Sequence, residues 1–408
     1  MDERAIGRNV ARWRRRRGMT RKLFADRVGR SVAWVDKVER GERSLTKLPL
    51  LERVAEVLQV PMAVLTDSAE ALRADQCPDP VELAAIRAAL QSYESLTGAI
   101  WSSDHVRPEP DMARLRRQVG YAWSAFQASH YSSLGRLLPQ LLRDTQDAAW
   151  ELTGDEALAA RGLLSQVYQL AAATLLKLGD AELAWLAADR GVHAARRADD
   201  RLVAADAVRR LAHSLLTRGD NKPALRLLVA TAERMTPALD GASAEHLSVY
   251  GMTFLRGAIA AARTGDRATV RDLLSEADVA AASLGDDRNE RWTAFGPTNV
   301  AVHRVAALVE LADGALAVEA ADRIDPASLA RLTRERRAGF YVDLAAAHSQ
   351  SGRGSDAIAH LLTAEQIAAE EVRCRQAVRN LVGDLLERSP RTPPLELRLL
   401  AQRIGAQA

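Results

Sequence analysis

The chain has 408 residues, of which 48% are hydrophobic and 27% charged, and its formal net charge is +3. This length and composition indicate a globular protein with at least two domains rather than a disordered one. No stretch approaches 18 consecutive apolar residues, and the basic run near the start has no apolar run behind it, so neither a membrane span nor a signal peptide is predicted. We therefore expect a cytoplasmic protein.

The residue types that carry chemistry form no enzyme pattern. Cys77 and Cys374 occur without a CxxC or Cys/His cluster, which argues against structural zinc. The eight histidines are scattered, and HExxH, GxSxG and glycine-rich phosphate loops are absent from the sequence. The sequence therefore predicts no enzyme, no cofactor and no metal.

Positive charge is concentrated at the N-terminus. Residues 1–47 hold 15 Lys/Arg and 6 Asp/Glu, a net of +9, so the remainder of the chain carries −6. Such a basic head on a mildly acidic body is typical of a protein whose head meets a polyanion. The alternative for the run RWRRRRG by itself is a solvated helix end, whose arginines lie near the negative end of the helix dipole.

Five short helical patterns follow one another in residues 1–67. The first ends near Gly18, and Thr20 and Ser31 are candidate N-caps for the second and third, which stop at Gly29 and Gly41. Apolar spacing over 48–58 predicts a fourth helix, and PMAVLTD a fifth. The tight glycine-containing turn between the second and third helices is typical of a helix-turn-helix.

The stretch TRKLFADRVGRSVAWVDKVERGER, with LPLLERVAEVLQV after it, resembles the XRE-type helix-turn-helix of the phage repressors. Three blocks of that pattern occur in order and at the expected spacing, and the resemblance covers residues 4–67. It implies a five-helix, lambda-repressor-like DNA-binding domain whose third helix enters the major groove.

The resemblance also implies which side chains meet DNA. Lys37 can donate to guanine, and Val32 and Ala33 can contact thymine methyl groups. Trp34 either lies along the sugar-phosphate backbone or packs on a neighbouring helix, while Arg14 and Glu39 should form an internal ion pair. The expected DNA-binding residues are Arg21, Ser31, Val32, Ala33, Trp34, Lys37, Arg40, Arg43, Ser44 and Lys47.

Operators of this family are usually inverted repeats, so the resemblance implies two partners, double-stranded DNA and a second copy of the chain. A homodimer would place its two heads about one helical turn (~34 Å) apart.

The body of the chain follows a predicted linker and connecting helix at 68–110, where the stretch SAEALRADQCPDPVE contains two prolines. Residues 111–408 show nearly continuous helical periodicity and no strand-like alternation. Turn glycines recur at 179, 219, 265, 314 and 352, with spacings of 40, 46, 49 and 38 residues. This recurrence predicts a repeated helix–turn–helix unit and an all-α fold.

Two of these units, LLKLGDAELAWLAADRGVHAA and HSQSGRGSDAIAHLLTAEQIA, resemble tetratricopeptide repeats, although the period exceeds the standard length. We count five clear units, a degenerate first one at about 111–150 and a final capping helix. The resemblance implies an α-solenoid that binds its ligand on a concave surface made by the first helices.

The stretch RWTAFGPTNVAVHRVA at 291–306 is the strongest candidate for that surface. Pro297 can open a helix, which places Asn299 and His303 on one face, just after Trp292 and Phe295. These groups could hold a peptide backbone or a small polar molecule; alternatively, the aromatics are core and Asn299 bridges helices. The predicted effector-binding residues are Trp292, Phe295, Asn299, His303, Tyr250, Phe254 and Tyr341. Secondary candidates, each more typical of packing, are Tyr168 with Gln169, Arg209 with His213, and His348 beside Tyr341.

The layout as a whole is similar to two groups of regulators. One comprises the peptide-sensing quorum regulators of Gram-positive bacteria; the other comprises actinobacterial regulators with Ala/Arg-rich helical bodies, whose sequences the FGPTN stretch resembles. The sequence thus predicts a transcription regulator controlled by a peptide or small-molecule effector. The alternative is a DNA-binding head whose repeat domain serves as a protein docking scaffold.

Overall fold

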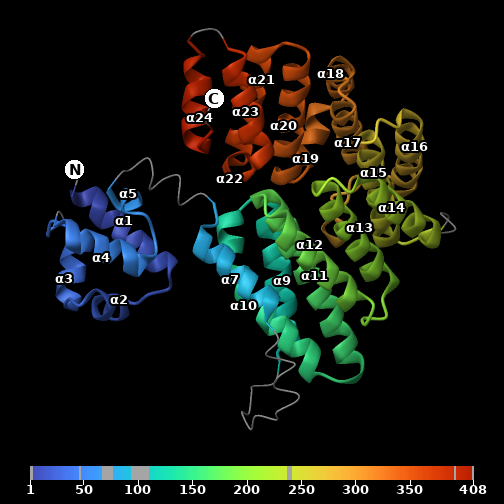
Figure 1. Cartoon of the computed structure of the whole chain (residues 1–408). Helices are drawn as coiled ribbons and strands as arrows, with labels where there is room; N and C mark the ends of the chain where they lie inside the picture. The colour runs from blue at the N-terminus through green and yellow to red at the C-terminus, as the bar shows by residue number, and fades with distance from the viewer. Residues whose placement is uncertain are drawn as a thin grey trace. The chain divides into compact units, whose positions relative to one another are not determined.

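The computed structural model describes residues 3–45, 47–66, 77–92, 110–236, 241–389 and 392–406. All regular structure within these ranges is helical, which confirms the predicted all-α class (Figure 1). Contacts divide the chain into two units, Met1–Val81 and Glu82–Ala408, and each is described by itself. In the same ranges, no helix combines the length and the apolar composition that crossing a membrane requires.

The first unit contains the five short helices predicted from its sequence. They are α1 (Glu3–Arg16), α2 (Arg21–Val28), α3 (Val32–Glu39), α4 (Leu48–Leu58) and α5 (Met62–Thr66). Thr20 Oγ1 accepts from the Leu23 amide at 3.2 Å, and Ser31 Oγ accepts from the Trp34 amide at 3.1 Å, so both predicted N-caps are present. Gly29 ends α2 in the left-handed conformation, with φ 71°.

One apolar core holds these helices together, and Trp13, Phe24, Val35 and Leu58 are among its fully buried members. Helix α1 lies close to α3 because Gly7 carries no side chain; a Cβ at this position would overlap the Val38 carbonyl oxygen. The core therefore fixes how α3 is presented at the surface of the unit.

Most of α7 (Pro80–Gln91) belongs to the second unit, and the helices that follow it form consecutive pairs (Figure 1). The six pairs are α9 (Met112–Gln127) with α10 (Tyr131–Glu151), α11 (Gly154–Leu178) with α12 (Ala181–Ala195), α13 (Arg201–Thr217) with α14 (Asn221–Met235), α15 (Ala244–Ala262) with α16 (Arg267–Leu284), α17 (Pro297–Glu310) with α18 (Gly314–Asp322), and α20 (Arg334–Gln350) with α21 (Gly354–Ile367). The shorter elements are η1 (Glu290–Trp292), α19 (Pro326–Arg331), α22 (Ala369–Cys374), α23 (Gln376–Glu387) and α24 (Leu395–Ile404).

The first helices of successive pairs pack on one another, since α11 contacts α13, α13 contacts α15, α15 contacts α17, and α17 contacts α20. Alanines such as Ala172, Ala260 and Ala345 are fully buried along these helices, and their small side chains allow the backbones to approach. The first helices thus form a continuous inner wall, as expected for an α-solenoid.

This wall curves until its last pair meets its first. Helix α9 contacts α20, and α11 contacts α22. The Tyr131 hydroxyl is hydrogen-bonded to Glu371, and Glu370 accepts from the Ser132 amide at 2.7 Å. Lys177 Nζ lies 2.5 Å from Glu335 and 2.6 Å from Glu371. These contacts hold the inner faces of the first and last repeats around a common space.

Candidate functional site

Helix α3 presents its N-terminal end to solvent. Val32 is 45% exposed, and Ala33 and Lys37 are exposed beside it. Val35 and Val38 on the opposite face are fully buried and anchor the helix to the core. The predicted base-reading side chains therefore share an accessible surface on a rigidly held helix.

The sequence left two arrangements open for Trp34, along the DNA backbone or packed on a neighbouring helix, and the structure has the packed one. Its side chain is only 6% exposed and belongs to the core of the first unit. The Trp34 side chain packs α3 against the core of the first unit and is not part of the exposed surface of α3.

The ion pair between Arg14 and Glu39, expected from the family resemblance, is present. Arg14 Nε and Nη2 donate to the two Glu39 oxygens at 2.5 and 3.1 Å, and Arg14 Nη1 donates to the Met19 carbonyl at 2.7 Å. Arg21 Nε adds a bond of 2.9 Å to Glu39. Burial by itself would raise the pKa of Glu39, but the hydrogen bonds from Arg14 and Arg21 outweigh it, and the pKa lies below its ordinary value. This network fastens α1 and the start of α2 to the end of α3.

The other predicted DNA-binding cations fall into two groups. Arg21 and Arg40 are engaged within the unit, since Arg21 also approaches Asp36 and Arg40 pairs with Asp36 and with Glu42. In contrast, three exposed cations have no hydrogen bond or ion pair in the described part of the unit: Lys37, Arg43 and Lys47. Ser44 is exposed near them.

Lys22 on α2 and Arg30, directly before the N-cap of α3, are further exposed cations of this kind that were not predicted. Arg30 lies in the turn of the helix-turn-helix, and this position is the sequence signal that would have found it.

The basic run after Trp13 is structural. Arg17 donates to the Leu58 carbonyl at 2.9 Å and pairs with Asp79 at 2.6 Å, while Arg16 donates to the Cys77 carbonyl at 2.8 Å. Both guanidinium groups lie over the Trp13 ring, at 4.6 and 5.1 Å from its centroid. These arginines hold the chain around 77–79 against α1, so they are not free for a nucleic acid.

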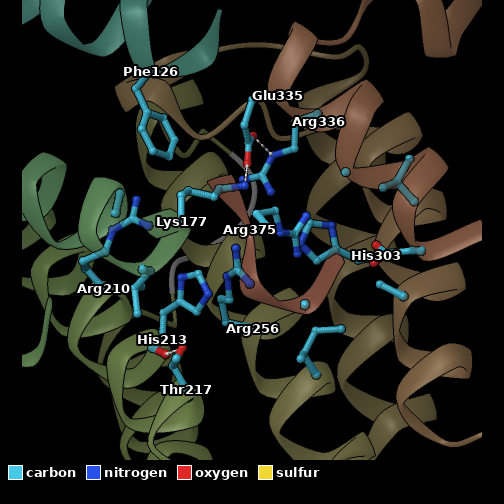
Figure 2. A pocket seen from close by; sticks show the side chains of 18 of the residues that line it. Phe126, Lys177, Arg210, His213, Thr217, Arg256, His303, Glu335, Arg336 and Arg375 are labelled. Atoms are coloured by element: carbon cyan, nitrogen blue, oxygen red, sulfur yellow. Dashed lines mark hydrogen bonds and ion pairs between the residues drawn. The ribbon is translucent and has the colours of Figure 1, made fainter. Parts of the chain in front are cut away.

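The second unit contains a cavity of about 480 Å³ enclosed by the inner wall (Figure 2). Its lining comes from every first helix from α9 to α20, together with Gly179, Ala181, Trp292 and residues 375–377. The seven cationic side chains in the lining are Lys177, Arg209, Arg210, Arg256, Arg263, Arg336 and Arg375. The three acidic ones are Glu310, Glu335 and Asp343. The cavity is thus rich in positive charge.

Several of these cations have acidic partners. Lys177 pairs with Glu335 and Glu371, and Glu371 also accepts from Arg375 at 3.0 Å. Arg263 pairs with Glu310 at 2.7 Å. Arg209 Nε donates to Asp206 at 2.9 Å. For these side chains the protein itself supplies the compensating charge.

Arg210 and Arg256 differ, because neither has an acidic partner among the described residues and the Nε of each is buried without a hydrogen bond. Burial, followed by the charge of Arg209, lowers the pKa of Arg210 to about 9. Burial and then Arg336 hold the pKa of Arg256 well below its ordinary value. The Arg210 guanidinium also lies 5.9 Å from the centroid of the Trp123 ring.

Two histidines complete this part of the wall. Burial and then Arg256 hold the pKa of His213 well below its ordinary value, and burial and then Arg336 do the same for His303. Both imidazoles are therefore neutral near pH 7. Burial is thus the main cause of their depressed pKa values, and the neighbouring arginine charges add to it.

Two of the seven predicted effector-binding residues, Trp292 and His303, line the cavity. The Trp292 ring stacks on Trp123 with 6.4 Å between centroids and 7° between planes. His303 Nδ1 lies 2.9 Å from the Asn299 carbonyl oxygen, which can only accept, so the proton of the neutral ring lies on Nδ1.

The other five lie in the packing between helices. Phe295 is fully buried against Gly251, and Asn299 is fully buried with its amide 3.6 Å from the Met252 sulfur. Tyr250 and Phe254 pack edge to face at 4.7 Å, and Tyr341 stacks on His360 at 5.9 Å. Of the secondary candidates, Arg209 and His213 line the cavity.

The remaining secondary candidates make packing contacts. Tyr168 accepts from Gln146 at 3.0 Å, Gln169 donates to Ser165 at 3.2 Å, and His348 stacks on His360 at 4.8 Å. Four cavity cations were not predicted from the sequence: Lys177, Arg210, Arg256 and Arg336. Their signal is a cation inside the Ala/Leu-rich first helix of a repeat, where an apolar residue is the usual choice.

No three His, Cys, Asp or Glu side chains within the described ranges are grouped so that they could hold a metal ion.

Comparison with known proteins gives one match at the level of a family: residues 5–69 match the helix-turn-helix domain family. Together with the capped α2–α3 geometry, this shows that the N-terminal unit contains a helix-turn-helix domain. No curated protein matches the chain at a significant level.

Among solved structures, the crystal structure of Bacillus thuringiensis PlcR in complex with the peptide PapR7 and DNA is similar to this chain. The identity is 15%, the TM-score is 0.31, and the match covers 69% of this chain and 95% of that one. A likeness this loose defines neither the ligand nor the activity of this chain.

Proposed function

We propose that the protein is a sequence-specific DNA-binding transcription regulator, controlled by an effector that binds in the cavity of its repeat domain. The observation that carries the DNA-binding part is the matched helix-turn-helix, whose third helix presents exposed Val32, Ala33 and Lys37. Helices of this motif read base edges in the major groove with the residues near their N-terminus.

The free cations around α3 have distinct roles in this proposal. Lys37 donates to a guanine, and Val32 and Ala33 contact thymine methyl groups. Arg43 and Lys47, which follow α3, contact phosphates and supply salt-dependent affinity. Arg21 and Arg40 are engaged with acidic side chains of their own unit and contribute less than the sequence suggests.

Assembly and boundaries are part of the same proposal. One helix-turn-helix head covers a short site, so a homodimer on an inverted repeat is the arrangement that gives specificity. The proposed domains are the DNA-binding head at 1–67, the linker and connecting helix at 68–110, and the repeat domain at 111–408. The setting is the cytoplasm, where the DNA lies.

The cavity supports a ligand-controlled regulator over a docking scaffold. Its volume of about 480 Å³ is within the range of small-molecule sites, and its lining combines two tryptophans with ten charged groups. A scaffold for proteins would instead present an open, extended surface.

The test is a selection of bound fragments from sheared genomic DNA with the purified full-length protein, followed by affinity measurements on the enriched site. The Lys37→Ala variant should weaken binding to that site by about 1–3 kcal/mol while leaving binding to unrelated DNA nearly unchanged. The matched variant Arg43→Ala should weaken binding to all sequences alike and reduce the salt dependence.

Enrichment of an inverted repeat that Lys37→Ala no longer prefers would support the proposal. An unchanged sequence preference in Lys37→Ala, or a protein that binds no DNA with or without added small anions, would contradict it.

A further inference from the structure

The cavity of the repeat domain contains charges that the protein does not balance. Seven cationic side chains line it against three acidic ones, and Arg210 and Arg256 have no acidic partner in the described part of the unit. Arg210 is only 7% exposed, so its charge is nearly removed from solvent. A buried charge without a partner is costly, and proteins retain such charges where a ligand completes them.

We propose that the effector is a small organic anion whose phosphate or carboxylate group binds between Arg210 and Arg256. This inference rests on the proposed function, of which it names the ligand class. The two guanidinium groups come from adjacent first helices, α13 and α15, and both line the cavity that Lys177 and Arg336 also line (Figure 2). Guanidinium groups bind such oxygens with paired, charge-assisted hydrogen bonds.

The unpaired status of these two arginines is specific to them. Their neighbours Arg209, Arg263 and Arg375 each have an acidic partner at 3.0 Å or less. The protein thus neutralises these three arginines and leaves the guanidinium groups of Arg210 and Arg256 for an outside anion. The positive potential of the cavity would repel a cationic ligand or a metal ion.

The rest of the wall indicates that the anion has an apolar part. Trp123, Phe126 and Trp292 line the same cavity, with the two tryptophans stacked at 6.4 Å. Arg210 lies over the Trp123 ring, so the charged and the aromatic parts of the wall adjoin. A molecule with an anionic group on a flat or apolar body would contact both.

The backbone next to Trp292 carries strain that is typical of binding sites. Arg291, Trp292 and Ala294 have φ of 49°, 61° and 50°, in the left-handed region that residues other than glycine rarely adopt. Gln127 holds this segment by donating to the Trp292 carbonyl at 3.3 Å. The strained segment positions the tryptophan ring at the edge of the cavity.

The test uses the full-length protein without DNA and three probes: phenyl phosphate, inorganic pyrophosphate and citrate. Calorimetry and tryptophan fluorescence would be read up to about 10 mM of each probe, where a millimolar Kd is visible. Phenyl phosphate carries both an anion and a ring, and citrate separates carboxylate from phosphate recognition. We expect phenyl phosphate to bind most tightly and to change the fluorescence of Trp123 and Trp292.

Arg256→Met and Arg210→Met should each weaken phenyl phosphate binding about 10- to 100-fold. The matched control is Arg271→Met on α16, an exposed arginine outside the cavity, which should leave binding unchanged. Both cavity variants should fold, because replacing an unpaired buried cation with an apolar side chain relieves a desolvation cost. The ligand should also raise Tm in the wild type and not in these variants.

Equal affinity in the wild type and both cavity variants would overturn the proposal, because the anion would then bind elsewhere, such as the basic head. Failure of all three probes to bind would overturn it as well. Neither result would affect the DNA-binding part of the proposed function, which is measured by the genomic selection.

Discussion

The Glu39 carboxylate holds the exposed surface of α3 in place, because it links the end of α3 to α1 and α2. Its side chain is 3% exposed and faces Arg14, whose side chain is 9% exposed, and Arg21. Replacing it by Gln would leave the Arg14 charge buried and uncompensated, which costs about 3–5 kcal/mol. We therefore expect Glu39→Gln to destabilise the first unit strongly and to weaken DNA binding by misplacing α3.

Hydrogen exchange of the α1 and α3 amides would report this loss. The control is Glu42→Gln, because the Glu42 side chain is 51% exposed and its pair with Arg40 should contribute under about 1 kcal/mol. Because the folded pKa of Glu39 is depressed, its stabilisation is present above the unfolded value of 4.5 and is lost as the pH falls below it. Equal protection in both variants would contradict this assignment.

Asp343 has the opposite behaviour. Burial raises its pKa from 3.8 to about 6, although Arg375 partly offsets the effect. Between these two pKa values the native state retains a proton that the unfolded chain has released, so stability falls as the pH rises through this window. Asp343→Asn should therefore stabilise the second unit at pH 7.5, by up to about 3 kcal/mol, and the gain should disappear below pH 4.

Urea unfolding at the two pH values measures this difference, and the matched control is Asp272→Asn, which changes an exposed carboxylate on α16. Since Asp343 lines the cavity, the same substitution should also strengthen binding of phenyl phosphate. A stability gain that is independent of pH would show that the pKa of Asp343 is the same in the native and unfolded states.

At the scale of elements, the contact between α15 and the segment before α17 depends on Gly251. A Cβ at this position would overlap the ring of Phe295, which is fully buried. Gly251→Ala should destabilise the second unit by about 1–3 kcal/mol, because the ring has no free space into which it can move. The control is Gly339→Ala in α20, where a Cβ would meet nothing within 4 Å, and where we expect a small gain of about 0.5–1 kcal/mol. The denaturant midpoints of the two variants measure these effects. An unchanged midpoint in Gly251→Ala would mean that α15 and the Phe295 ring pack less tightly than the structure shows.

The elements themselves could be predicted from the sequence because their signals are local. Thr20 and Ser31 cap the helices that they were expected to cap, and the turn glycines Gly179 and Gly265 adopt positive φ of 83° and 75°. The site was predictable only in part. Helical spacing places Asn299 and His303 near one face, but it does not say whether that face meets the cavity or the next repeat. Asn299 is fully buried, and only His303 reaches the lining.

At the scale of the second unit, the closure of the repeat array had no sequence signal. Tyr131 and Glu371 are hydrogen-bonded although 240 positions separate them, and Lys177 reaches Glu335 across 158. Glutamate and lysine are common on the exposed faces of helices, so their presence in the sequence does not indicate an ion pair. Only the curvature of the whole array brings these side chains close enough to pair. For the same reason the cations of separate repeats could not be recognised as one cluster before the array was assembled.

That curvature links the proposed effector to the proposed DNA response. An anion between Arg210 and Arg256 joins α13 to α15, and neighbouring repeats would adjust their angle around it. If this adjustment changes DNA affinity by some factor, thermodynamic linkage requires that DNA change the affinity for the anion by the same factor. Couplings of this kind are typically about 5- to 150-fold.

We therefore expect saturating phenyl phosphate to shift the Kd for the selected operator, and operator DNA to shift the Kd for phenyl phosphate equally. Fluorescence anisotropy measures the Kd for the operator, and calorimetry measures the Kd for phenyl phosphate. In Arg256→Met the operator Kd without ligand should match the wild type, because this residue lies outside the DNA-binding unit, while the response to phenyl phosphate should be lost. A response of the same size in Arg256→Met would show that the anion competes with DNA phosphates at Arg43 and Lys47, and that the cavity has no part in it.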